Sequence, residues 1–420
     1  MKKIIFPFIL IFSLGIKIIL AQGECWTAKT DMSIERSALS ACSVNGIIYA
    51  IGGSWDAYTS TSTVQAYRPT KDTWTYKADL PQELCGITAC TVNNKIYVIG
   101  GSTAVLGTGY VIDSVYEYDP VSNSWTRKSN IPTPLAYAAA DVVDGKIYVF
   151  GGCRFGFNSV YKNVYEYNPA IDTWTKKSDM PTAKFFASAT VVDGKIYVFG
   201  GMDRLTGEGF SVVEVYDPST DTWVVKEPMP IPRTGHVSST VDGNIYIFSG
   251  GLGMGSIYND VLEYNPVLGT WATKTSIPTP RGFAAACCVG GKIYIFGGMD
   301  VANNRLTTVE EYDPALDTTN IIFVGVDNNS VIPATYKLEQ NYPNPFNPAT
   351  TISYSIPSTS LVSLSVYNIL GQEVAVLINE VREAGFYNVE FSGADLASGL
   401  YFYRLSTENF TQIKKMLLVK

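Results

Sequence analysis

The chain has 420 residues, of which 16% are charged and 13% are aromatic, and it contains 36 Gly, 21 Pro, 27 Tyr and one His. Low charge with many Tyr, Gly and Pro is typical of short strands joined by turns, and it argues against an all-helical protein. The net charge of −7 provides no basic field for nucleic acid. The single His excludes metal sites that need two or more imidazole ligands.

Residues 1–23 are predicted to be a secretory signal peptide. Met1-Lys2-Lys3 is a short basic start, the apolar run from Ile4 to Ile16 is too short to span a membrane as a mature helix, and Ala21-Gln22-Gly23 supplies small residues for cleavage. The alternative is an uncleaved membrane anchor. No later stretch reaches 18 unbroken apolar residues, so we expect no transmembrane segment in the mature chain.

One pattern repeats between residue 25 and about residue 318. Six apolar segments end in a pair of small residues about 49 residues apart, at Gly52-Gly53, Gly100-Gly101, Gly151-Gly152, Gly200-Gly201, Ser249-Gly250 and Gly297-Gly298. Each pair is followed by a Tyr-x-Pro, at Tyr67, Tyr118, Tyr167, Tyr216, Tyr264 and Tyr312. A Trp follows seven residues after five of these Tyr, at Trp74, Trp125, Trp174, Trp223 and Trp271.

The spacing within the repeat locates its loops. The interval from each Trp, starting with Trp26, to the next small-residue pair is 26 residues in all six units, whereas the interval from the pair to the Tyr varies from 15 to 18. Segments of fixed length indicate paired strands, because a one-residue slip would turn side chains to the wrong face. The variable segment is therefore predicted to be a surface loop.

These units resemble the kelch repeat, which implies six blades of a β-propeller, each a four-stranded antiparallel sheet. The sixth unit has Thr319 where its Trp should stand, and Trp26 precedes the first small-residue pair. We therefore predict an all-β propeller at residues 24–325 whose sixth blade is closed by an N-terminal strand. Trp26 should then contact the sheet that contains Tyr294 and Tyr312.

The C-terminal part predicts a second β domain. Residues 326–335 are polar and contain Pro, which favours a linker. In residues 336–420, apolar runs that are separated by turns begin at Thr351, Leu361, Phe386 and Gly399. Such runs predict a small Ig-like β-sandwich.

Four segments of this second domain carry a specific resemblance: YPNPFNP from Tyr342, VYNILGQ from Val366, ADLASGLY from Ala394 and KKMLLVK from Lys414. They resemble the C-terminal sorting domain of the type IX secretion (Por) system. The resemblance implies that residues 336–420 engage the type IX machinery of a Gram-negative bacterium. It also implies that the propeller passes through the periplasm and is secreted or held at the outer cell surface. The alternative is an accessory binding sandwich.

The sequence offers no catalytic constellation, and we predict no catalytic residue, no metal and no cofactor. Galactose oxidase is a relative with kelch-type blades whose copper site requires two imidazoles, so the lone His236 excludes that chemistry. This His stands at a repeat position held elsewhere by Leu39, Ile87, Ala138, Ala187 and Ala284. That position favours inner-strand packing over a general base. The seven Cys, an odd number, are expected to be mostly small buried apolar side chains, and their pairing stays open.

Candidate binding residues gather on one predicted face, where the variable loop meets the connection that enters the next blade. That connection carries cations sixteen residues before the small-residue pair, at Arg36, Lys184, Arg233 and Arg281. We expect these four to ring the mouth of the central channel. The variable loops add Trp55, Tyr58, Tyr110, Arg154, Phe155, Arg204, Tyr258 and Arg305. The alternative is that these residues are merely solvated loop residues and ion pairs between blades.

Exposed aromatic side chains beside Arg and Asp suit stacking on sugar rings or gripping peptide carboxylates. The leading hypothesis is a non-catalytic propeller that binds a glycan or protein ligand. It predicts that the double variant Arg233→Ala with Arg281→Ala binds the ligand more weakly and keeps nearly the same thermal stability. One alternative is a carbohydrate-active enzyme similar to the kelch-type sialic-acid mutarotases. Another is a structural surface protein whose propeller is an adhesive module.

Overall fold

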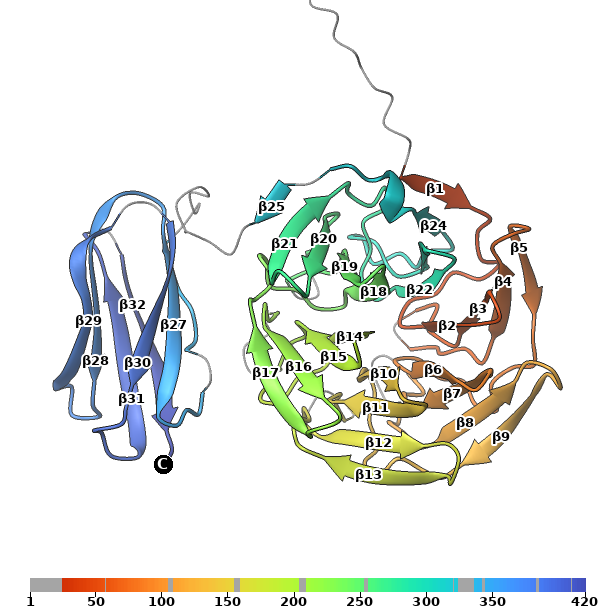
Figure 1. The fold of residues 1–420 in the computed structure, drawn as a ribbon, viewed down its shortest axis with the longest axis horizontal. Helices are drawn as coiled ribbons and strands as arrows, with labels where there is room; N and C mark the ends of the chain where they lie inside the picture. The colour runs from red at the N-terminus through yellow and green to blue at the C-terminus, as the bar shows by residue number, and fades with distance from the viewer. Residues whose placement is uncertain are drawn as a thin grey trace, which may run out of the picture.

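The fold is almost entirely β-strand and turn. The structure is a computed structural model, and it describes residues 25–56, 58–104, 109–154, 159–203, 209–252, 256–319, 321–323, 336–341, 344–382, 385–408 and 410–420. Six sheets are arranged around a central axis, with β2, β6, β10, β14, β18 and β22 innermost (Figure 1). One short 3-10 helix lies at Pro314–Leu316.

The first three blades run from the inner to the outer strand in chain order. Blade 1 contains β2 (Ser40–Val44), β3 (Ile47–Ile51), β4 (Val64–Arg68) and β5 (Thr73–Tyr76). Blade 2 contains β6 (Thr88–Val92), β7 (Lys95–Ile99), β8 (Val115–Asp119) and β9 (Ser124–Lys128). Blade 3 contains β10 (Ala139–Val143), β11 (Lys146–Phe150), β12 (Val164–Asn168) and β13 (Thr173–Lys177).

Blades 4 and 5 repeat this order, and blade 6 follows it for three strands before β1 from the N-terminus completes it. Blade 4 contains β14 (Ser188–Val192), β15 (Lys195–Phe199), β16 (Val213–Asp217) and β17 (Thr222–Lys226). Blade 5 contains β18 (Val237–Val241), β19 (Asn244–Phe248), β20 (Val261–Asn265) and β21 (Thr270–Lys274). Blade 6 contains β22 (Ala285–Val289), β23 (Lys292–Phe296), β24 (Val309–Tyr312) and β1 (Trp26–Lys29).

The first hairpin of every blade is fixed by local turn chemistry. In each blade two residues with positive φ join the first two strands, at Asn45-Gly46, Asn93-Asn94, Asp144-Gly145, Asp193-Gly194, Asp242-Gly243 and Gly290-Gly291. Two-residue turns of this kind match the twist of paired strands and favour Asn, Asp and Gly. The second strand is buried along almost its whole length because neighbouring blades cover both of its faces.

The repeat Trp joins each blade to the one before it. In blade 1 the Trp74 ring lies 4.9 Å from Tyr67 and 5.8 Å from Phe296 of blade 6, measured between ring centroids. Its Nε1 donates a hydrogen bond to the carbonyl oxygen of Thr30 at 2.8 Å. The same indole-to-carbonyl bond recurs from the other blades, at Trp26, Trp125, Trp174, Trp223 and Trp271. The repeat Trp therefore packs between neighbouring blades.

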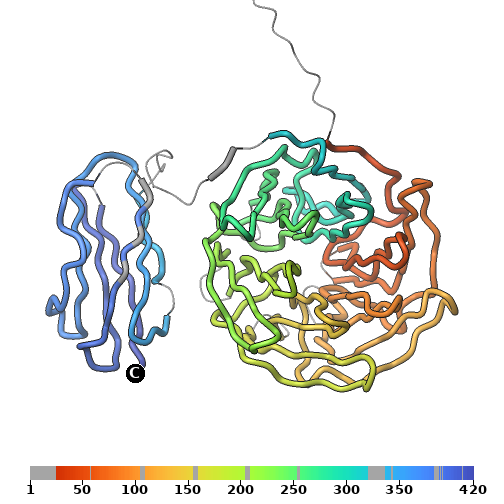
Figure 2. Tube along the Cα trace, in the orientation of Figure 1, coloured from red at the N-terminus to blue at the C-terminus, as the bar shows by residue number. Residues whose placement is uncertain are grey.

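The N-terminal strand closes the propeller. β1 pairs antiparallel with β24, with Trp26 opposite Tyr312 and their rings 4.8 Å apart. Figure 2 shows the red N-terminal segment beside the blue-green end of the propeller. This is the arrangement that the Trp spacing predicts, and it pairs the free edge of the last blade.

Blade 5 has an addition that the repeat does not predict. β25 (Ile321–Phe323) pairs antiparallel with β21 and forms a fifth, outermost strand. Trp271 on β21 is 2% exposed, whereas the Trp at this position in the other blades are only partly buried. The chain therefore leaves the propeller along the edge of blade 5 rather than directly from blade 6.

The C-terminal part is a sandwich of two sheets around its own core. One sheet has the order β26 (Lys337–Leu338), β27 (Ala349–Ile356), β30 (Gly385–Ser392). The other has the order β29 (Glu373–Arg382), β28 (Ser360–Tyr367), β31 (Gly399–Ser406), β32 (Thr411–Leu418). Ile352, Leu364, Tyr403 and Met416 are among the buried residues between them. All four predicted strands are present, at β27, β28, β30 and β31.

The cysteines are buried packing residues, as expected. Cys25, Cys42, Cys85, Cys90, Cys153 and Cys287 are buried, Cys288 is partly buried, and all seven are free thiols in the structure. Burial raises the pKa of the Cys42 thiol to about 12, so this thiol stays protonated and unreactive.

Candidate functional site

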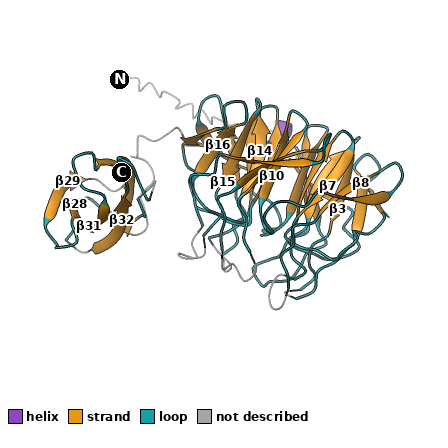
Figure 3. Cartoon of the chain, turned by 90° about the horizontal axis from the view of Figure 1, so that it is seen from below, coloured by secondary structure: helices purple, strands orange, loops and turns teal. Residues whose placement is uncertain are grey.

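The loops that vary in length lie on one face of the propeller, which we call the loop face. In blade 1, Ser54 after the small-residue pair forms bridges with Ser37, which precedes the inner strand, and with Ser60, which precedes the third strand. Equivalent bridges hold the other blades, so both sets of connections meet at the same end. Figure 3 shows the long connections extending from one side of the strands.

The four predicted cations do not ring the mouth of the channel as exposed groups. Arg36, Lys184, Arg233 and Arg281 are at most 1% exposed. In blade 6, Arg281 donates to the carbonyl oxygens of Gly297 at 2.9 Å and Thr308 at 3.0 Å, and to Glu310 at 2.7 Å. These side chains therefore tie together the ends of strands within a blade, as buried ion pairs and hydrogen bonds. The expectation of an exposed ring of charge was wrong.

Each buried cation has its own acceptor inside its blade. Lys184 Nζ lies 2.7 Å from a Glu214 carboxylate oxygen, and Arg233 Nη2 lies 2.6 Å from an Asp260 oxygen. Arg36 donates to Gln65 Oε1 at 2.8 Å, and burial lowers the pKa of Arg36 to about 10. A long side chain with this much polar contact is positioned by the fold and is not free to meet a ligand.

The two blades without a cation are consistent with this structural role. Gln65, Glu214 and Glu310 stand two residues before the repeat Tyr, and the equivalent residues in blades 2 and 3 are Tyr116 and Tyr165. In those same blades the cation is replaced by Leu84 and Leu135, which are buried. In blades 2 and 3 the cation and the acceptor are thus both replaced, whereas in blade 5 the acceptor position holds Leu262 and Arg233 pairs with Asp260 instead. Comparing the two positions would therefore have revealed this signal in five of the six blades.

Large aromatic side chains do reach solvent on the loop face. Trp55 is 44% exposed and Tyr58 is 69% exposed on the blade 1 loop, and Tyr110 is 75% exposed on the blade 2 loop. The two loops touch, because Ser60 Oγ donates to the carbonyl oxygen of Ser102 at 3.4 Å. The three exposed rings therefore belong to neighbouring blades whose loops are in contact.

Charged residues border this aromatic group. Asp56 accepts hydrogen bonds from the N–H groups of Tyr58 at 2.7 Å and Thr59 at 2.6 Å. These bonds lower the pKa of Asp56, and the positive charge of Arg305 on the blade 6 loop adds to the shift. Arg305 is partly buried, and its Nη1 donates to the carbonyl oxygen of Asn303 at 2.7 Å.

The remaining predicted loop residues are dispersed. Arg154 is exposed on the blade 3 loop. Tyr258 is partly buried and lies 5.4 Å from the Arg233 guanidinium carbon, so it covers a buried cation instead of standing free. Phe155 and Arg204 lie outside the described residues.

A hydrogen-bonded ring closes the channel at the loop face, and the sequence analysis missed it. It is built from the residues fourteen positions before each small-residue pair: Ala38, Gly86, Tyr137, Phe186, Gly235 and Phe283. The N–H group of each donates to the carbonyl oxygen of its counterpart in the preceding blade, at 2.7–3.1 Å. All six have φ between 53° and 63°, which is unusual for the three aromatic members.

Side chains from this ring fill its centre. The Phe186 ring lies 4.6 Å from Tyr137 and 4.7 Å from Phe283. Glycines elsewhere in the ring leave room, since a Cβ on Gly86 would lie 2.5 Å from the Tyr137 ring and one on Gly235 would lie 3.0 Å from the Phe283 ring. We call the side chains of Tyr137, Phe186 and Phe283 the aromatic plug. Alternation of glycine with large aromatics at one repeat position was the available sequence signal.

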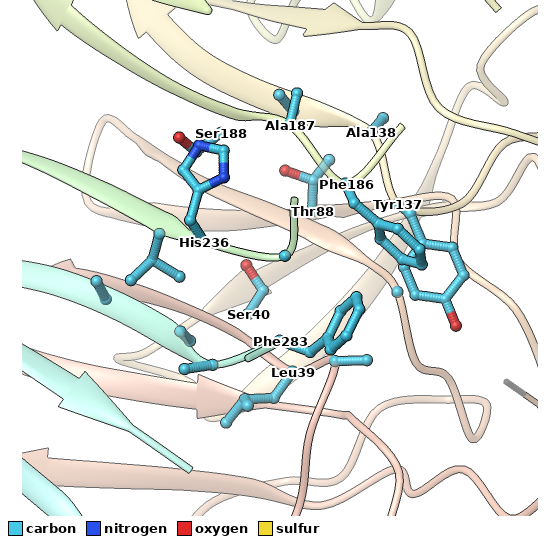
Figure 4. A pocket seen from close by; sticks show the side chains of 18 of the residues that line it. Leu39, Ser40, Thr88, Tyr137, Ala138, Phe186, Ala187, Ser188, His236 and Phe283 are labelled. Atoms are coloured by element: carbon cyan, nitrogen blue, oxygen red, sulfur yellow. The ribbon is translucent and has the colours of Figure 1, made fainter. Parts of the chain in front are cut away.

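A cavity of about 180 Å³ lies in the channel against the aromatic plug. Figure 4 shows the plug rings gathered together, with His236 and Ser188 apart from them. His236 is 4% exposed, and burial, with the charges of Arg233 and Lys184, lowers its pKa to about 3. A histidine that stays neutral at neutral pH is a poor general base, in agreement with the structural role that its repeat position favours.

The family models match both parts of the chain. The Attractin/LZTR1 beta-propeller model matches residues 26–262, which is more than half of the chain. The chain belongs to this family. A Kelch motif model also matches residues 280–318, in the sixth blade. The predicted kelch-type propeller is confirmed.

Individual relatives resemble the propeller over part of its length. Kelch-like protein 35 of Mus musculus is 29% identical over 132 residues, covering 31% of this chain and 21% of that protein. Beta-scruin of Limulus polyphemus is 29% identical over 130 residues, covering 30% of this chain and 14% of that protein. The matches thus span about a fifth and a seventh of these curated relatives.

Among solved structures, that of YjhT aligns with a TM-score of 0.61 at 17% identity, covering 70% of this chain and 99% of that one. At this level of identity the similarity is one of fold. It supports the propeller architecture that the six blades show.

The sandwich has its own match. The model of a secretion system C-terminal sorting domain covers residues 340–420, which confirms the predicted sorting domain and implies export through the type IX machinery. In the described part of the chain no helix is long and apolar enough to cross a membrane. The same part contains no cluster of three His, Cys, Asp or Glu arranged to hold a metal ion.

Proposed function

We propose that the protein is an exported propeller that binds a glycan or protein ligand on its loop face without catalysing a reaction. The observation that carries this proposal is the group of Trp55, Tyr58 and Tyr110, three large aromatic side chains exposed on two loops that touch. Monomeric proteins have little reason to expose such side chains together unless they form a contact surface. The sorting domain supports a location where extracellular ligands are available.

The chemistry of this surface suits adhesion. Aromatic rings stack on the apolar faces of sugars and peptides at little entropic cost, because they have few rotatable bonds. Arg305 adds a donor for carboxylates, and the hydrogen bonds that Asp56 accepts restrain the backbone at Tyr58 and Thr59 in the blade 1 loop. Preorganisation of this kind reduces the entropy that binding would otherwise cost.

The catalytic alternative has less support. A carbohydrate-active enzyme would need an acid or base that converges on the same surface. The pKa of Asp56 is lowered by the hydrogen bonds of its own turn, and His236 is buried. A sialic-acid mutarotase-like activity therefore becomes an outcome of the test and not the leading proposal.

The test screens the purified protein on glycan and peptide arrays and then compares variants against the best ligand. Trp55→Ala with Tyr58→Ala should weaken binding at least tenfold. The matched control is Tyr76→Ala, a 60% exposed Tyr on the outer strand of the same blade, which should change affinity less than twofold. Equal affinity of all variants, or turnover of an anomeric sugar by the wild-type protein, would overturn the proposal.

Export is tested separately. Removal of residues 336–420 should leave the propeller inside the cell envelope, whereas the full chain is found outside it. If truncation does not change export, the sorting domain does not act as proposed, and the binding proposal remains to be judged on its own experiment.

A further inference from the structure

We infer that the outer face of the four-stranded sheet in the sandwich is a dimer interface, covered by the same face of a second copy of this chain. The sheet has the strand order β29, β28, β31, β32, and Figure 3 shows these strands side by side. We call its outer face the sheet face. The dimer does not use the loop face, so it stands or falls independently of the proposed function.

The first support is the number of aliphatic side chains that the sheet face exposes. Successive residues of a strand point to opposite sides, so every second residue here points away from the core of the sandwich. Six aliphatic residues at such positions are at least 39% exposed: Leu361, Val376, Val381, Leu400, Ile413 and Leu417. An exposed apolar face of this kind marks an interaction surface.

The other outer face of the sandwich has a different composition. On β27, the central strand of the three-stranded sheet, the outward positions hold Thr351, Ser353 and Ser355, which alternate with the buried Ile352 and Tyr354. Hydroxyl side chains are what a solvated sheet face favours. The apolar character is therefore particular to the sheet face and is not a general property of this small domain.

The second support is the order of residues across the sheet face. The strand register aligns them in rows that cross all four strands from β29 to β32. One row is Glu373, Tyr367, Phe402 and Lys415. The next row is Val376, Ser365, Arg404 and Ile413. The first row thus has an acid at one end, a base at the other and two rings between them, and the second row has an aliphatic residue at each end.

These rows are self-complementary under a two-fold rotation. A two-fold axis that lies between two copies and runs parallel to the strands places β29 of one copy over β32 of the other. Glu373 then faces Lys415 of the partner subunit, and Val376 faces Ile413 of the partner subunit. Sheets that pack face to face keep their strand directions within about 30° of each other, which this arrangement allows.

The charged residues at the ends of the first row are available for such pairing. Glu373 and Lys415 are both exposed, and within the described residues neither takes part in an ion pair. The Tyr367 hydroxyl donates to Glu373 Oε2 at 3.2 Å, and the Arg404 guanidinium carbon lies 4.7 Å from the centre of the Tyr367 ring. These contacts restrain the side chains on the sheet face, and opposite charges at matching positions fix the register of an interface.

The size of the sheet face limits the affinity of the dimer. Four strands about 4.8 Å apart, each about eight residues long, cover roughly 500 Å². Two such faces bury about 1,000 Å², which is at the low end for a specific interface. We therefore expect a Kd of about 1–100 µM and not an obligate dimer. Two copies carry two loop faces and would bind a repetitive ligand with higher avidity, and this consequence alone rests on the proposed function.

Sedimentation equilibrium of the purified full chain, at about 1–300 µM, measures the dimer. The wild-type protein should dimerise with a Kd below about 100 µM. Ile413→Asp should weaken dimerisation at least about tenfold, because a symmetric interface buries the new charge twice. Glu373→Lys and Lys415→Glu should each have an effect of about the same size, because each dimer then contains two pairs of like charges. The double variant restores opposite charges and should return to within about threefold of the wild-type Kd.

Two matched controls place the contact on the sheet face. Lys337→Glu reverses an exposed charge on the three-stranded sheet and should change the Kd less than about twofold. The double variant Trp55→Ala with Tyr58→Ala alters the loop face and should likewise leave dimerisation unchanged. Because all of the replaced side chains are exposed, the far-UV circular dichroism of every variant should match that of the wild-type protein.

Any of four results would overturn the inference. The first is a monomer at every concentration, and the second is a dimer that Ile413→Asp does not weaken. The third is a double charge variant that dimerises no better than the single ones. The fourth is a dimer lost on Trp55→Ala with Tyr58→Ala, which would place the contact on the propeller. A monomer whose export is abolished by Ile413→Asp would assign the sheet face to the export machinery instead.

Discussion

The buried pair of Lys184 and Glu214 in blade 4 makes the most direct test of how the propeller is held together. The charged atoms lie 2.7 Å apart, and both side chains are completely buried. Replacing Lys184 by Leu removes the positive charge that lies 2.7 Å from the buried Glu214 carboxylate. The structure therefore predicts a large loss of stability and no direct effect on a ligand at the loop face.

The magnitude follows from the burial of the pair. Breaking a buried ion pair by removing one partner typically costs about 3–5 kcal/mol, because the remaining charge is uncompensated. Replacing both partners by well-packed apolar groups is often close to neutral. In blade 3 the two equivalent positions hold Leu135 and Tyr165 in place of an ion pair. The Tyr165 hydroxyl lies 2.8 Å from the Thr133 hydroxyl, which gives it a hydrogen-bond partner. Blade 4 has Thr182 at the position equivalent to Thr133.

We therefore expect Lys184→Leu alone to lower the free energy of unfolding by about 3–5 kcal/mol. The double variant Lys184→Leu with Glu214→Tyr should recover to within about 1.5 kcal/mol of the wild-type protein. Urea unfolding followed by Trp fluorescence measures this, since all seven Trp lie between residues 26 and 271, within the propeller. A single variant that loses less than 1 kcal/mol, or a double variant no more stable than the single one, would refute the reasoning.

Three further changes test other parts of the structure. Trp26→Ala should lower the free energy of unfolding by about 2–3 kcal/mol in the same urea assay, because the closing strand β1 loses its ring contacts with Tyr312 and Phe248. An effect no larger than that of Tyr76→Ala would contradict the closure of the propeller by β1. Gly86→Ala should lower the midpoint of thermal unfolding clearly more than Gly46→Ala, because both glycines have positive φ but only the first would drive a methyl group against the Tyr137 ring. Burial raises the pKa of Asp141 from 3.8 to about 6, so the folded state binds the proton of this carboxyl group more tightly than the unfolded state does. The free energy of unfolding should therefore fall by up to about 3 kcal/mol as the pH rises from about 4 to 6. Asp141→Asn should remove that part of the pH dependence of urea unfolding, and an unchanged pH profile would count against it.

The blades were predictable because strand pairing fixes the number of residues in the paired segments of each repeat. A fixed interval from Trp to the small-residue pair is the consequence of strand pairing, and the displaced Trp26 revealed how the ring closes. The same argument cannot detect β25, which pairs with β21 and belongs to no repeat unit. Edge pairing of this kind leaves little trace in side-chain pattern.

The cations show why the site was harder to predict than the fold. Arg281 stands on a connection at the loop face, and sequence position alone cannot tell whether its long side chain turns outward or inward. The answer lies in Glu310, which is separated from it by a complete hairpin and a variable loop. The comparison of both positions between blades, Arg281 and Glu310 against Leu135 and Tyr165, carries that information for blade 6, whereas Arg233 of blade 5 takes its acceptor, Asp260, from another position.

Blade 5 departs furthest from the repeat, and its departures have a common location. Ser249 replaces the first glycine of the pair, Gly269 replaces the acid or Asn that accepts the repeat Tyr hydroxyl in the other blades, and His236 replaces a small or apolar inner residue. As a result the Tyr264 hydroxyl is buried without a partner in the described structure, as are the nitrogens of His236. A repeat reflects what packing requires, so a blade that gives up packing contacts without gaining stability is where a functional requirement is expected. The unpaired groups of Tyr264 and His236 therefore mark blade 5 as the part of this propeller where such a requirement is expected.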